Sequence, residues 1–180
     1  AVKLLTSLGY KIIVVKHGES GRTYLSKGLI RRAQKIAKKN IDIFKTIINE
    51  QVPLLGIEPS AILAFRDEYP ELCGKELKTD TERIAANSFL IDEFLNSEYK
   101  TGRIDKSAFT EKETSILLHA HCQQKAIASS ACTIEALSIP ANYKVKEIPS
   151  GCCGMAGSFG YEKEHYDLSN KIGEMVLFPE

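Results

Sequence analysis

The spacing of apolar residues along the chain predicts short strands that alternate with helices. Aliphatic and β-branched runs bounded by Gly, Pro or polar residues are typical of buried strands, and they occur at residues 11–15, 52–57, 115–118 and 143–148. The 3.6-residue period of an amphipathic helix occurs at residues 26–49, 60–69, 81–99, 123–137 and 161–177. This alternation predicts an α/β fold with parallel strands and flanking helices.

A polar segment and an internal repeat divide the chain into two halves. Residues 101–114 are polar and carry a cluster of charges, which is typical of a boundary. A shift of 133 residues aligns residues 18–21 with residues 151–154 without a gap. We therefore predict two similar halves, residues 1–105 and 106–180, each built from a strand, a Gly-rich turn and a helix.

The repeat also predicts that both halves are truncated. At the same offset, Cys122 corresponds to a position before residue 1, so the first half lacks an opening strand. The second half reaches Glu180 before any match to the strand at residues 52–57. Because the chain also begins at Ala1 rather than Met, we expect a fragment of a longer protein, from which a targeting signal could have been lost.

Composition and charge narrow the range of functions. The 180 residues are 43% apolar with a formal net charge of +1, which is ordinary for a globular protein. No apolar run approaches the ~20 residues that span a bilayer. Residues 1–40 carry ten Lys or Arg and one acid, concentrated on the predicted helix at 26–49. A solvated helix face explains this charge and docking of an acidic redox partner is the alternative, whereas nucleic acid is not expected because no aromatic residues are interleaved.

The five cysteines point to reduced thiols rather than to a disulfide framework. Their number is odd and Cys152 is adjacent to Cys153, a pattern that favours metal ligation or redox chemistry in the cytoplasm. The pair lies in a Gly-rich turn, residues 151–160, after a predicted strand. Backbone N–H groups of such a turn would stabilise negative charge. Two thiolates on this turn therefore suit a multi-iron cluster.

Cys122 is the candidate for a third thiolate. It follows the predicted strand at 115–118, and ligands bind at the carboxyl ends of strands in open α/β sheets. Lys125, one helical turn further on, either hydrogen-bonds and balances an anionic cluster or is a solvated helix lysine. Cys73 and Cys132 are expected to pack as small apolar side chains.

Zinc is the competing metal at the same place. His119 and His121, together with the three thiols, offer nitrogen and sulfur ligands of the kind that zinc favours. No C-x-x-C pair occurs in the chain, however, and hydrogen bonding at the strand end is favoured over ligation for both histidines. The chain also lacks a nucleophile elbow, a Walker loop and a dinucleotide fingerprint after a strand, which argues against hydrolase and nucleotide-dependent functions.

Four stretches carry a resemblance to a known family. HGESGRTYLSKGL, GIEPSAILAFRDEYPEL, HAHCQQKA and SGCCGMAGSFGYEKEHYDLS resemble the cysteine-rich CCG domain of iron–sulfur oxidoreductase subunits. They are most similar to the C-terminal region of FAD-linked oxidases of the D-lactate dehydrogenase and glycolate oxidase type. The resemblance covers nearly the whole chain. It implies two Rossmann-like half-domains, truncated at both ends.

The resemblance also implies a set of cluster-binding residues in the second half. For one 4Fe-4S cluster these are Cys122, Cys152 and Cys153. The residue pattern adds Gly151 and Gly154 of the turn and Lys125 as further cluster-binding candidates. The resemblance places a final cysteine beyond Glu180, so the site within this chain is incomplete. In the first half, Glu19 and Ser20 replace the cysteine pair and Ala61 replaces the terminal cysteine, which implies a degenerate site.

The function implied by the resemblance is electron transfer. FAD in upstream domains would oxidise a 2-hydroxy acid such as D-lactate or glycolate, and electrons would pass through a ferredoxin-like domain and this region to a quinone, a cytochrome or an electron-transfer flavoprotein. The fragment alone is then not expected to be active. We expect a cytoplasmic protein, with membrane association of the complete polypeptide left open. The alternatives are thiol–disulfide chemistry like that of heterodisulfide reductase and a structural zinc or interaction module.

Overall fold

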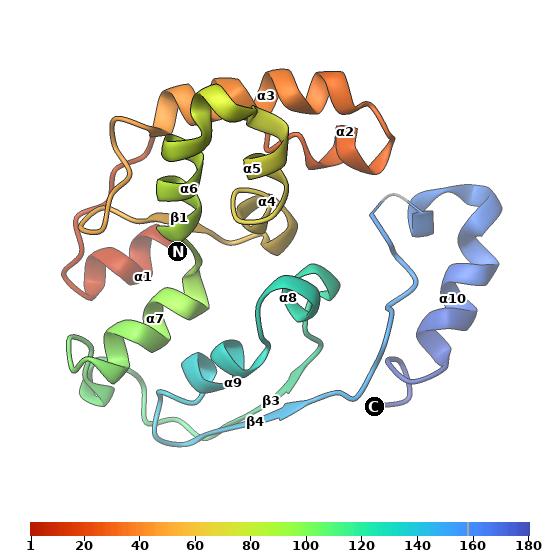
Figure 1. Ribbon diagram of the computed structural model, residues 1–180. Helices are drawn as coiled ribbons and strands as arrows, with labels where there is room; N and C mark the ends of the chain where they lie inside the picture. Colours follow the sequence, from red (N-terminus) through yellow and green to blue (C-terminus); the bar gives the residue numbers. More distant parts are fainter. Residues whose placement is uncertain (158) are drawn as a thin grey trace. The chain divides into compact units, whose positions relative to one another are not determined.

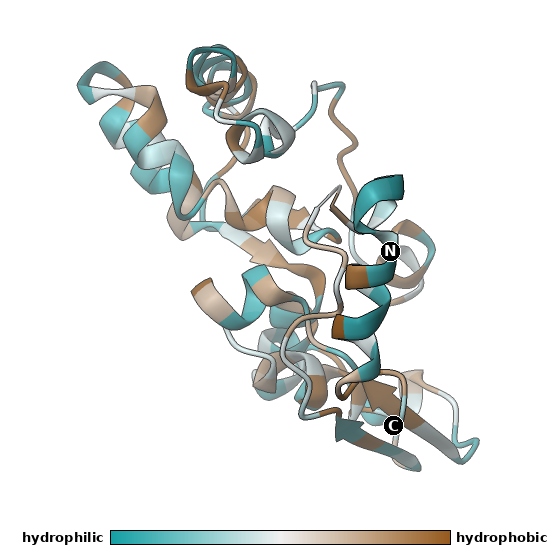
Figure 2. Ribbon diagram, turned by 90° about the vertical axis from the view of Figure 1, so that its right-hand side faces the viewer, coloured by the Kyte–Doolittle hydropathy of each residue, from teal (hydrophilic) through white to brown (hydrophobic). Residues whose placement is uncertain are grey.

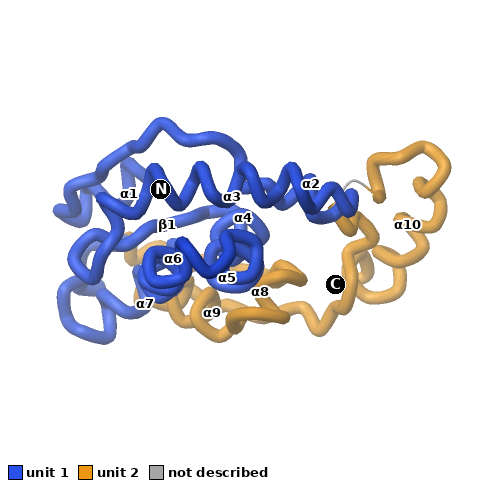
Figure 3. Tube along the Cα trace, turned by 45° about the horizontal axis from the view of Figure 1, so that its top comes forward, with its two compact units in different colours: residues 1–109 blue, residues 110–180 orange. Residues whose placement is uncertain are grey.

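The computed structural model describes residues 1–157 and 159–180. The chain divides into two compact units, Ala1–Phe109 and Thr110–Glu180, which Figure 3 colours separately. Within the described residues, no helix has both the length and the apolar character needed to cross a membrane.

Unit 1 is mainly helical and contains one small parallel sheet (Figure 1). Its helices are α1 (Val2–Ser7), α2 (Arg22–Ser26), α3 (Ile30–Phe44), α4 (Pro59–Leu63), α5 (Glu68–Cys73), α6 (Lys78–Ala86) and α7 (Ile91–Lys100), with short 3₁₀ helices η1 (Lys75–Leu77) and η2 (Lys106–Ala108). Strand β1 (Leu54–Gly56) pairs in parallel with β2 (Ser88–Leu90), in the register Leu54 to Ser88. Along the helices, hydrophilic and hydrophobic residues alternate (Figure 2), as expected of elements that bury one face.

The core of unit 1 lies where α3 packs on α5 and α6. Its largest fully buried apolar side chains are Ile41, Leu63, Tyr69 and Ile84. Burying a large apolar side chain contributes about 1.5 to 3 kcal/mol each, so this cluster stabilises the helices that are individually too short to persist in water.

The helix expected at residues 81–99 is interrupted in the structure. Helix α6 ends at Ala86, and Asn87 and Ser88 then hydrogen-bond the carbonyl groups of Arg83 and Ile84. Such side-chain bonds compete with helix continuation. The chain forms β2 and restarts as α7, whose Glu93 side chain accepts the N–H of Leu90.

The strand expected at residues 11–15 does not form. These residues belong to no helix or strand, and no strand in the described part of the chain pairs with them. The apolar sequence alone cannot produce a strand, because a strand exists only when its backbone finds a partner. The other three predicted strands are present in part or in full, as β1 and as the two strands of unit 2.

Unit 2 contains a second parallel pair of strands. Its elements are β3 (Thr114–Leu118), α8 (Cys122–Ile127), α9 (Ala131–Leu137), β4 (Tyr143–Glu147), η3 (Phe159–Tyr161), η4 (Lys163–His165) and α10 (Tyr166–Glu174). Strands β3 and β4 pair from Thr114 with Tyr143 to Leu118 with Glu147. The α8 and α9 helices connect them, as a parallel crossover requires. The mixed helices and parallel strands of both units confirm the broad α/β class.

The Gly-rich turns of the two units share one local feature. Gly21 and Gly154 both have positive φ angles, of 79° and 87°. A side chain at Gly21 would press on Ile36 of α3, and one at Gly154 would collide with Ser169 of α10. Positions 36 and 169 differ by the same 133 residues that align the two turns in the sequence. In each unit the turn glycine therefore allows the chain to pack closely on the next long helix.

Candidate functional site

The parallel pairing in unit 2 brings two cysteine-bearing segments to the same end of the sheet. Leu118 and Glu147 are register partners at the carboxyl ends of β3 and β4. The N–H of Ile148 donates to the carbonyl of Leu118 at 2.8 Å and so extends this alignment beyond the strands. Residues 119–122 leave β3 here and residues 149–153 leave β4. Open α/β sheets bind ligands at this edge.

The cysteine turn is held by a few specific contacts. The N–H of Gly154 donates to the Sγ of Cys152 at 3.3 Å, and the hydroxyl of Ser169 on α10 donates to the carbonyl of Gly154 at 3.0 Å. Cys152 is exposed, Cys153 is half-buried, and both are free thiols. Ala156 has a φ of 37°, which is rare for a residue with a side chain. The turn thus presents two thiols and directs one N–H group at sulfur.

Cys122 begins helix α8 on the other segment. His121 caps the helix, because its Nδ1 accepts the N–H of Gln123 at 3.1 Å. The Cys122 thiol is free and exposed. The structure therefore places Cys122 at a helix start that follows the end of β3, as the sequence pattern suggests, and gives His121 a capping contact.

His119 before Cys122 and Lys125 after it both hydrogen-bond to the segment that leads to the cysteine pair. The Nδ1 atom of His119 and the hydroxyl of Ser150 share a hydrogen bond of 2.6 Å. The ammonium of Lys125 donates to the carbonyl oxygens of Ser150 at 2.9 Å and Gly151 at 3.5 Å. We call His119, Lys125 and Ser150 the clamp. It connects the start of α8 to the residues immediately before Cys152.

The surroundings of His119 favour its uncharged form. Burial lowers the pKa of His119 below its ordinary value of 6.5, and the electrostatic effects of Lys125 and His121 lower it further. Ser150 is buried, so its hydroxyl needs an internal partner, which the imidazole supplies. His119 and Lys125 are thus both hydrogen-bonded to Ser150, in the segment that follows β4.

Cys122, Cys152 and Cys153 are residues of the type that binds an iron–sulfur cluster. The structure does not bring them close enough together to form a complete set of ligands. Three free thiols and an N–H group directed at sulfur are suitable donors for such a cluster. In residues 1–157 and 159–180, however, no three His, Cys, Asp or Glu side chains are placed so that they could share a metal ion. The ligand roles predicted for Cys122, Cys152, Cys153, His119 and His121 therefore stay predictions.

The remaining cysteines occupy different surroundings. Cys73 is completely buried at the end of α5, and burial raises the pKa of its thiol, which keeps it protonated. Cys132 is half-buried in α9. A buried protonated thiol is a poor metal ligand and a poor nucleophile, so Cys73 has the properties of a packing residue.

The corresponding turn of unit 1 is held by a buried polar pair. The amide of Asn40 donates to the carbonyl of Glu19 and to the hydroxyl of Tyr69, both at 2.9 Å. The Tyr69 hydroxyl in turn donates to the carbonyl of Ser20 at 2.8 Å. Burial raises the pKa of Tyr69 to about 12, so the phenol remains a donor. Backbone contacts thus fix the turn in which Glu19 and Ser20 stand in place of cysteines.

The basic residues of the first half lie mainly along α3. Arg31, Lys35 and Lys39 follow one another at four-residue intervals and are exposed, whereas Lys38 pairs with Glu76 of η1 at 2.5 Å. Residues four apart lie on the same face of a helix. The helix thus has a continuous positive stripe beside its buried apolar face.

Several contributors to these turns were not predicted from the sequence. Ser150, Asn40 and Tyr69 act through backbone carbonyl groups, and no spacing rule identifies such contacts. The roles of His119 and Lys125 toward Ser150 also depend on the register of β3 and β4. In the sequence, Ser150 is marked only as a polar residue before Gly151, the glycine that the repeat aligns with Gly18. This signal is too weak to predict its contacts.

Comparison with known proteins identifies relatives of the chain in sequence. No protein-family model and no solved structure matches the chain. The chain is 28% identical over 98% of its length to D-2-hydroxyglutarate dehydrogenase from Pantoea ananatis and 27% identical over 97% to that from Escherichia coli. It is 24% identical over 96% of its length to a subunit of anaerobic glycerol-3-phosphate dehydrogenase from Escherichia coli.

The chain is homologous to part of these dehydrogenases. It spans 16% of the length of each of the two D-2-hydroxyglutarate dehydrogenases and 42% of the glycerol-3-phosphate dehydrogenase subunit. These similarities support the interpretation that the chain is a region of an FAD-linked dehydrogenase. Two of these relatives are named for D-2-hydroxyglutarate and the third for glycerol-3-phosphate, and none of the three is named for D-lactate. The match in both kinds of protein extends over nearly the whole chain.

Proposed function

We propose that this chain is an electron-transfer region of a larger FAD-linked dehydrogenase that oxidises a 2-hydroxy acid. In this proposal Cys122, Cys152 and Cys153 are ligands of a 4Fe-4S cluster, completed by a cysteine from outside residues 1–180. The cluster would supply one-electron redox chemistry. The residues of this chain position the thiols and direct the N–H group of Gly154 at the Sγ of Cys152.

The observation that carries the proposal is the nature of the relatives. Nearly the same 180 residues match a D-2-hydroxyglutarate dehydrogenase and a glycerol-3-phosphate dehydrogenase subunit, whose names specify different substrates. A region shared by enzymes with different substrates is suited to a step common to both. Removal of electrons is such a step, whereas substrate recognition is not. The substrate of the complete protein is then read by residues outside this chain.

The site geometry supports the same role. The clamp attaches the segment before Cys152 to the start of α8, where Cys122 lies. Ordering both segments in advance reduces the entropy that a cluster must overcome when it binds. The N–H group of Gly154 already faces the Sγ of Cys152, and such bonds to sulfur adjust the reduction potential of a cluster.

Metal analysis of cysteine variants tests the proposal. The complete polypeptide is purified anaerobically, and iron, acid-labile sulfide, zinc and the EPR spectrum of the reduced protein are measured. Cys122→Ser, Cys152→Ser and Cys153→Ser are each expected to abolish the cluster signal assigned to this region. Cys132→Ser, which changes a half-buried thiol of the same unit, is the matched control and is expected to retain the signal.

Three results would contradict the proposal. Stoichiometric zinc without sulfide would indicate the structural module instead. An unchanged cluster signal in all three variants would show that these thiols are not its ligands. Disulfide reductase activity that is lost in Cys152→Ser but needs no iron would favour thiol–disulfide chemistry.

A further inference from the structure

The segment at residues 10–15 lies outside every helix and strand of the structure. It follows α1 and precedes the turn at residues 18–21, and no strand of the described chain forms a ladder with it. Ile13 is 56% exposed and Val14 is 82% exposed. Two neighbouring β-branched residues exposed on unpaired backbone form a template with which another strand can pair.

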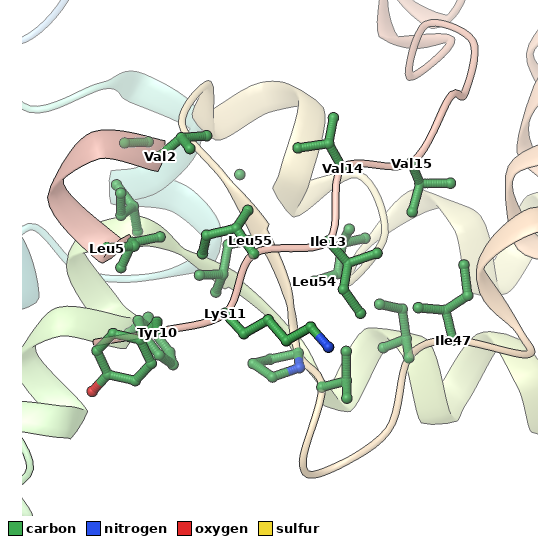
Figure 4. Close-up of a pocket in the computed structure, with 18 of the residues that line it drawn as sticks. Val2, Leu5, Tyr10, Lys11, Ile13, Val14, Val15, Ile47, Leu54 and Leu55 are labelled. Atoms are coloured by element: carbon green, nitrogen blue, oxygen red, sulfur yellow. The ribbon is translucent and has the colours of Figure 1, made fainter. Parts of the chain in front are cut away.

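An apolar cavity lies beside this segment. It has a volume of about 990 Å³ and is formed entirely by unit 1. Figure 4 shows Ile13, Val14 and Val15 on one side of it, near Leu54 and Leu55 of β1. Most of its other walls are apolar as well and include Leu5, Phe44, Ile48 and Phe94. Empty space of this size and character favours occupation by apolar side chains.

The internal repeat indicates what kind of segment pairs with residues 10–15. The 133-residue shift aligns residues 10–14 with β4 of unit 2, which is preceded by α9 as residues 10–14 are preceded by α1. In unit 2 this strand is not alone, because β3 pairs with it in parallel. Thr114 of β3 pairs with Tyr143, which lies 29 residues later. Unit 1 contains α1, the segment at residues 10–15 and the turn at residues 18–21. Its described residues contain no equivalent of β3.

We propose that residues 10–15 bind a parallel β-strand from the part of the same polypeptide that precedes residue 1. Counting the β3 to β4 spacing back from Tyr10 leads outside the 180 residues. The D-2-hydroxyglutarate dehydrogenases match this chain over only 16% of their length, so related proteins contain ample additional chain. The strand hydrogen-bonds to the backbone of residues 10–15, covers Ile13 and Val14, and directs apolar side chains into the cavity. This proposal does not depend on the proposed electron-transfer role.

Amide hydrogen exchange in the complete polypeptide tests this docking. The N–H groups of residues 12–15 are expected to exchange at least about tenfold more slowly than those of an unpaired segment. Val14→Asp places a charge on the covered edge and is expected to abolish this protection. Ile30→Asp changes an apolar residue of the same unit that is 47% exposed, and it is expected to leave the protection unchanged.

Cross-linking identifies the source of the strand and does not depend on any variant. Lys11 and Lys16 are exposed at the two ends of the segment, so an amine-reactive cross-linker can reach both. Mass spectrometry is expected to find them linked to a peptide from before residue 1 of the same molecule. Unprotected amides in the wild-type protein would overturn the proposal. Links between two copies, with protection that rises with protein concentration, would also overturn it and assign the edge to self-association.

Discussion

Lys125 illustrates how a single side chain can act at a site without touching a ligand. Its position one turn after Cys122 suggests a charge partner for an anionic cluster. In the structure its ammonium group instead donates to the carbonyl oxygens of Ser150 and Gly151. The positive charge remains in the region of the cysteine turn, but its direct partner is the backbone.

Replacing Lys125 should loosen the cysteine turn. Lys125→Met keeps much of the side-chain length and removes two N–H···O hydrogen bonds, which contribute about 0.5 to 1.5 kcal/mol each. We expect the amides of residues 150–154 to exchange roughly five to one hundred times faster, measured by hydrogen exchange and mass spectrometry. Lys144→Met, at an exposed position of β4, is the control. Equal exchange in the two variants would show that the clamp does not order the turn.

Glu98 gives unit 1 a pH dependence. It accepts hydrogen bonds from the Tyr10 hydroxyl at 2.7 Å and from the guanidinium of Arg103 at 2.7 and 2.8 Å. Burial alone would raise the pKa of Glu98, but the bonds from Arg103 and Tyr10 and the charge of Arg103 outweigh burial and lower the pKa below 4.5. The same burial, with the carboxylate, raises the pKa of Tyr10 to about 12.

Acid should therefore destabilise unit 1 through Glu98. The unfolded state, with the higher pKa, takes up protons first, so this stabilisation is complete above pH 4.5 and decreases as the pH falls through the lower pKa of the folded state. Glu98→Gln is expected to cost about 1 to 3 kcal/mol of unfolding free energy at pH 7, measured by urea denaturation. The difference from wild type should shrink below pH 4.5. A difference that stays constant down to pH 3 would contradict this assignment.

At the scale of elements, the apolar pattern predicted the positions of β1, β3 and β4 better than it predicted where the helices end. β1, β3 and β4 lie within or next to their expected ranges because their apolar runs are short and bounded by turn residues. β2 was missed because Ser88–Leu90 fits a helical period equally well, and only the polar pair before it and Glu93 after it indicate a break. The segment at residues 11–15 has a strand sequence but no partner, and pairing is a property that a local pattern does not contain.

Substitutions of Gly151 and Gly154 test how the turn that contains the cysteine pair packs on α10. A Cβ at Gly154 would collide with the carbonyl oxygen of Ser169, and its φ of 87° is unfavourable for a residue with a side chain. Gly154→Ala is expected to destabilise unit 2 by about 2 to 4 kcal/mol, from strain and overpacking together. Gly151→Ala meets no atom within 4 Å and should change stability by less than about 1 kcal/mol. Thermal unfolding followed by circular dichroism compares the two, and equal effects would contradict the packing argument.

The whole chain buries its apolar residues very unevenly. Among the described residues, the buried apolar side chains of unit 2 are only Ala120, Ile139 and Ile148, whereas unit 1 contains the large cluster around α3. A small core leaves little free energy to offset chain entropy, and small domains of this kind are commonly stabilised by a metal or cofactor. This imbalance is visible only in the structure, because both halves have similar apolar patterns.

Proteolysis should reveal this difference in stability. In the metal-free complete polypeptide, limited digestion is expected to cut within unit 2 before unit 1, since cleavage follows local unfolding. Reconstitution with iron and sulfide under anaerobic conditions should slow the cleavage in unit 2 at least about tenfold, because binding to the folded state stabilises it. Fragment mapping by mass spectrometry gives the order of cleavage. Protection that is unchanged by reconstitution would argue against metal binding in unit 2.

The candidate site was predictable in its parts but not in its assembly. The sequence alone singles out Cys122, Cys152, Cys153 and the Gly-rich turn, because adjacent thiols among glycines are unusual in a core. Their placement at one edge follows from parallel strands. The clamp depends on contacts between residues 25 or more positions apart and could not be predicted. The ligand roles themselves stay predictions that spectroscopy can decide.

The most direct test of the central claim is EPR spectroscopy of the complete protein after anaerobic reduction with dithionite. The account predicts a reduced-cluster signal from this region that is missing in Cys152→Ser and present in Cys132→Ser, which changes a half-buried thiol of the same unit. A cluster signal that forms equally in Cys152→Ser would contradict the claim that this chain holds the redox centre.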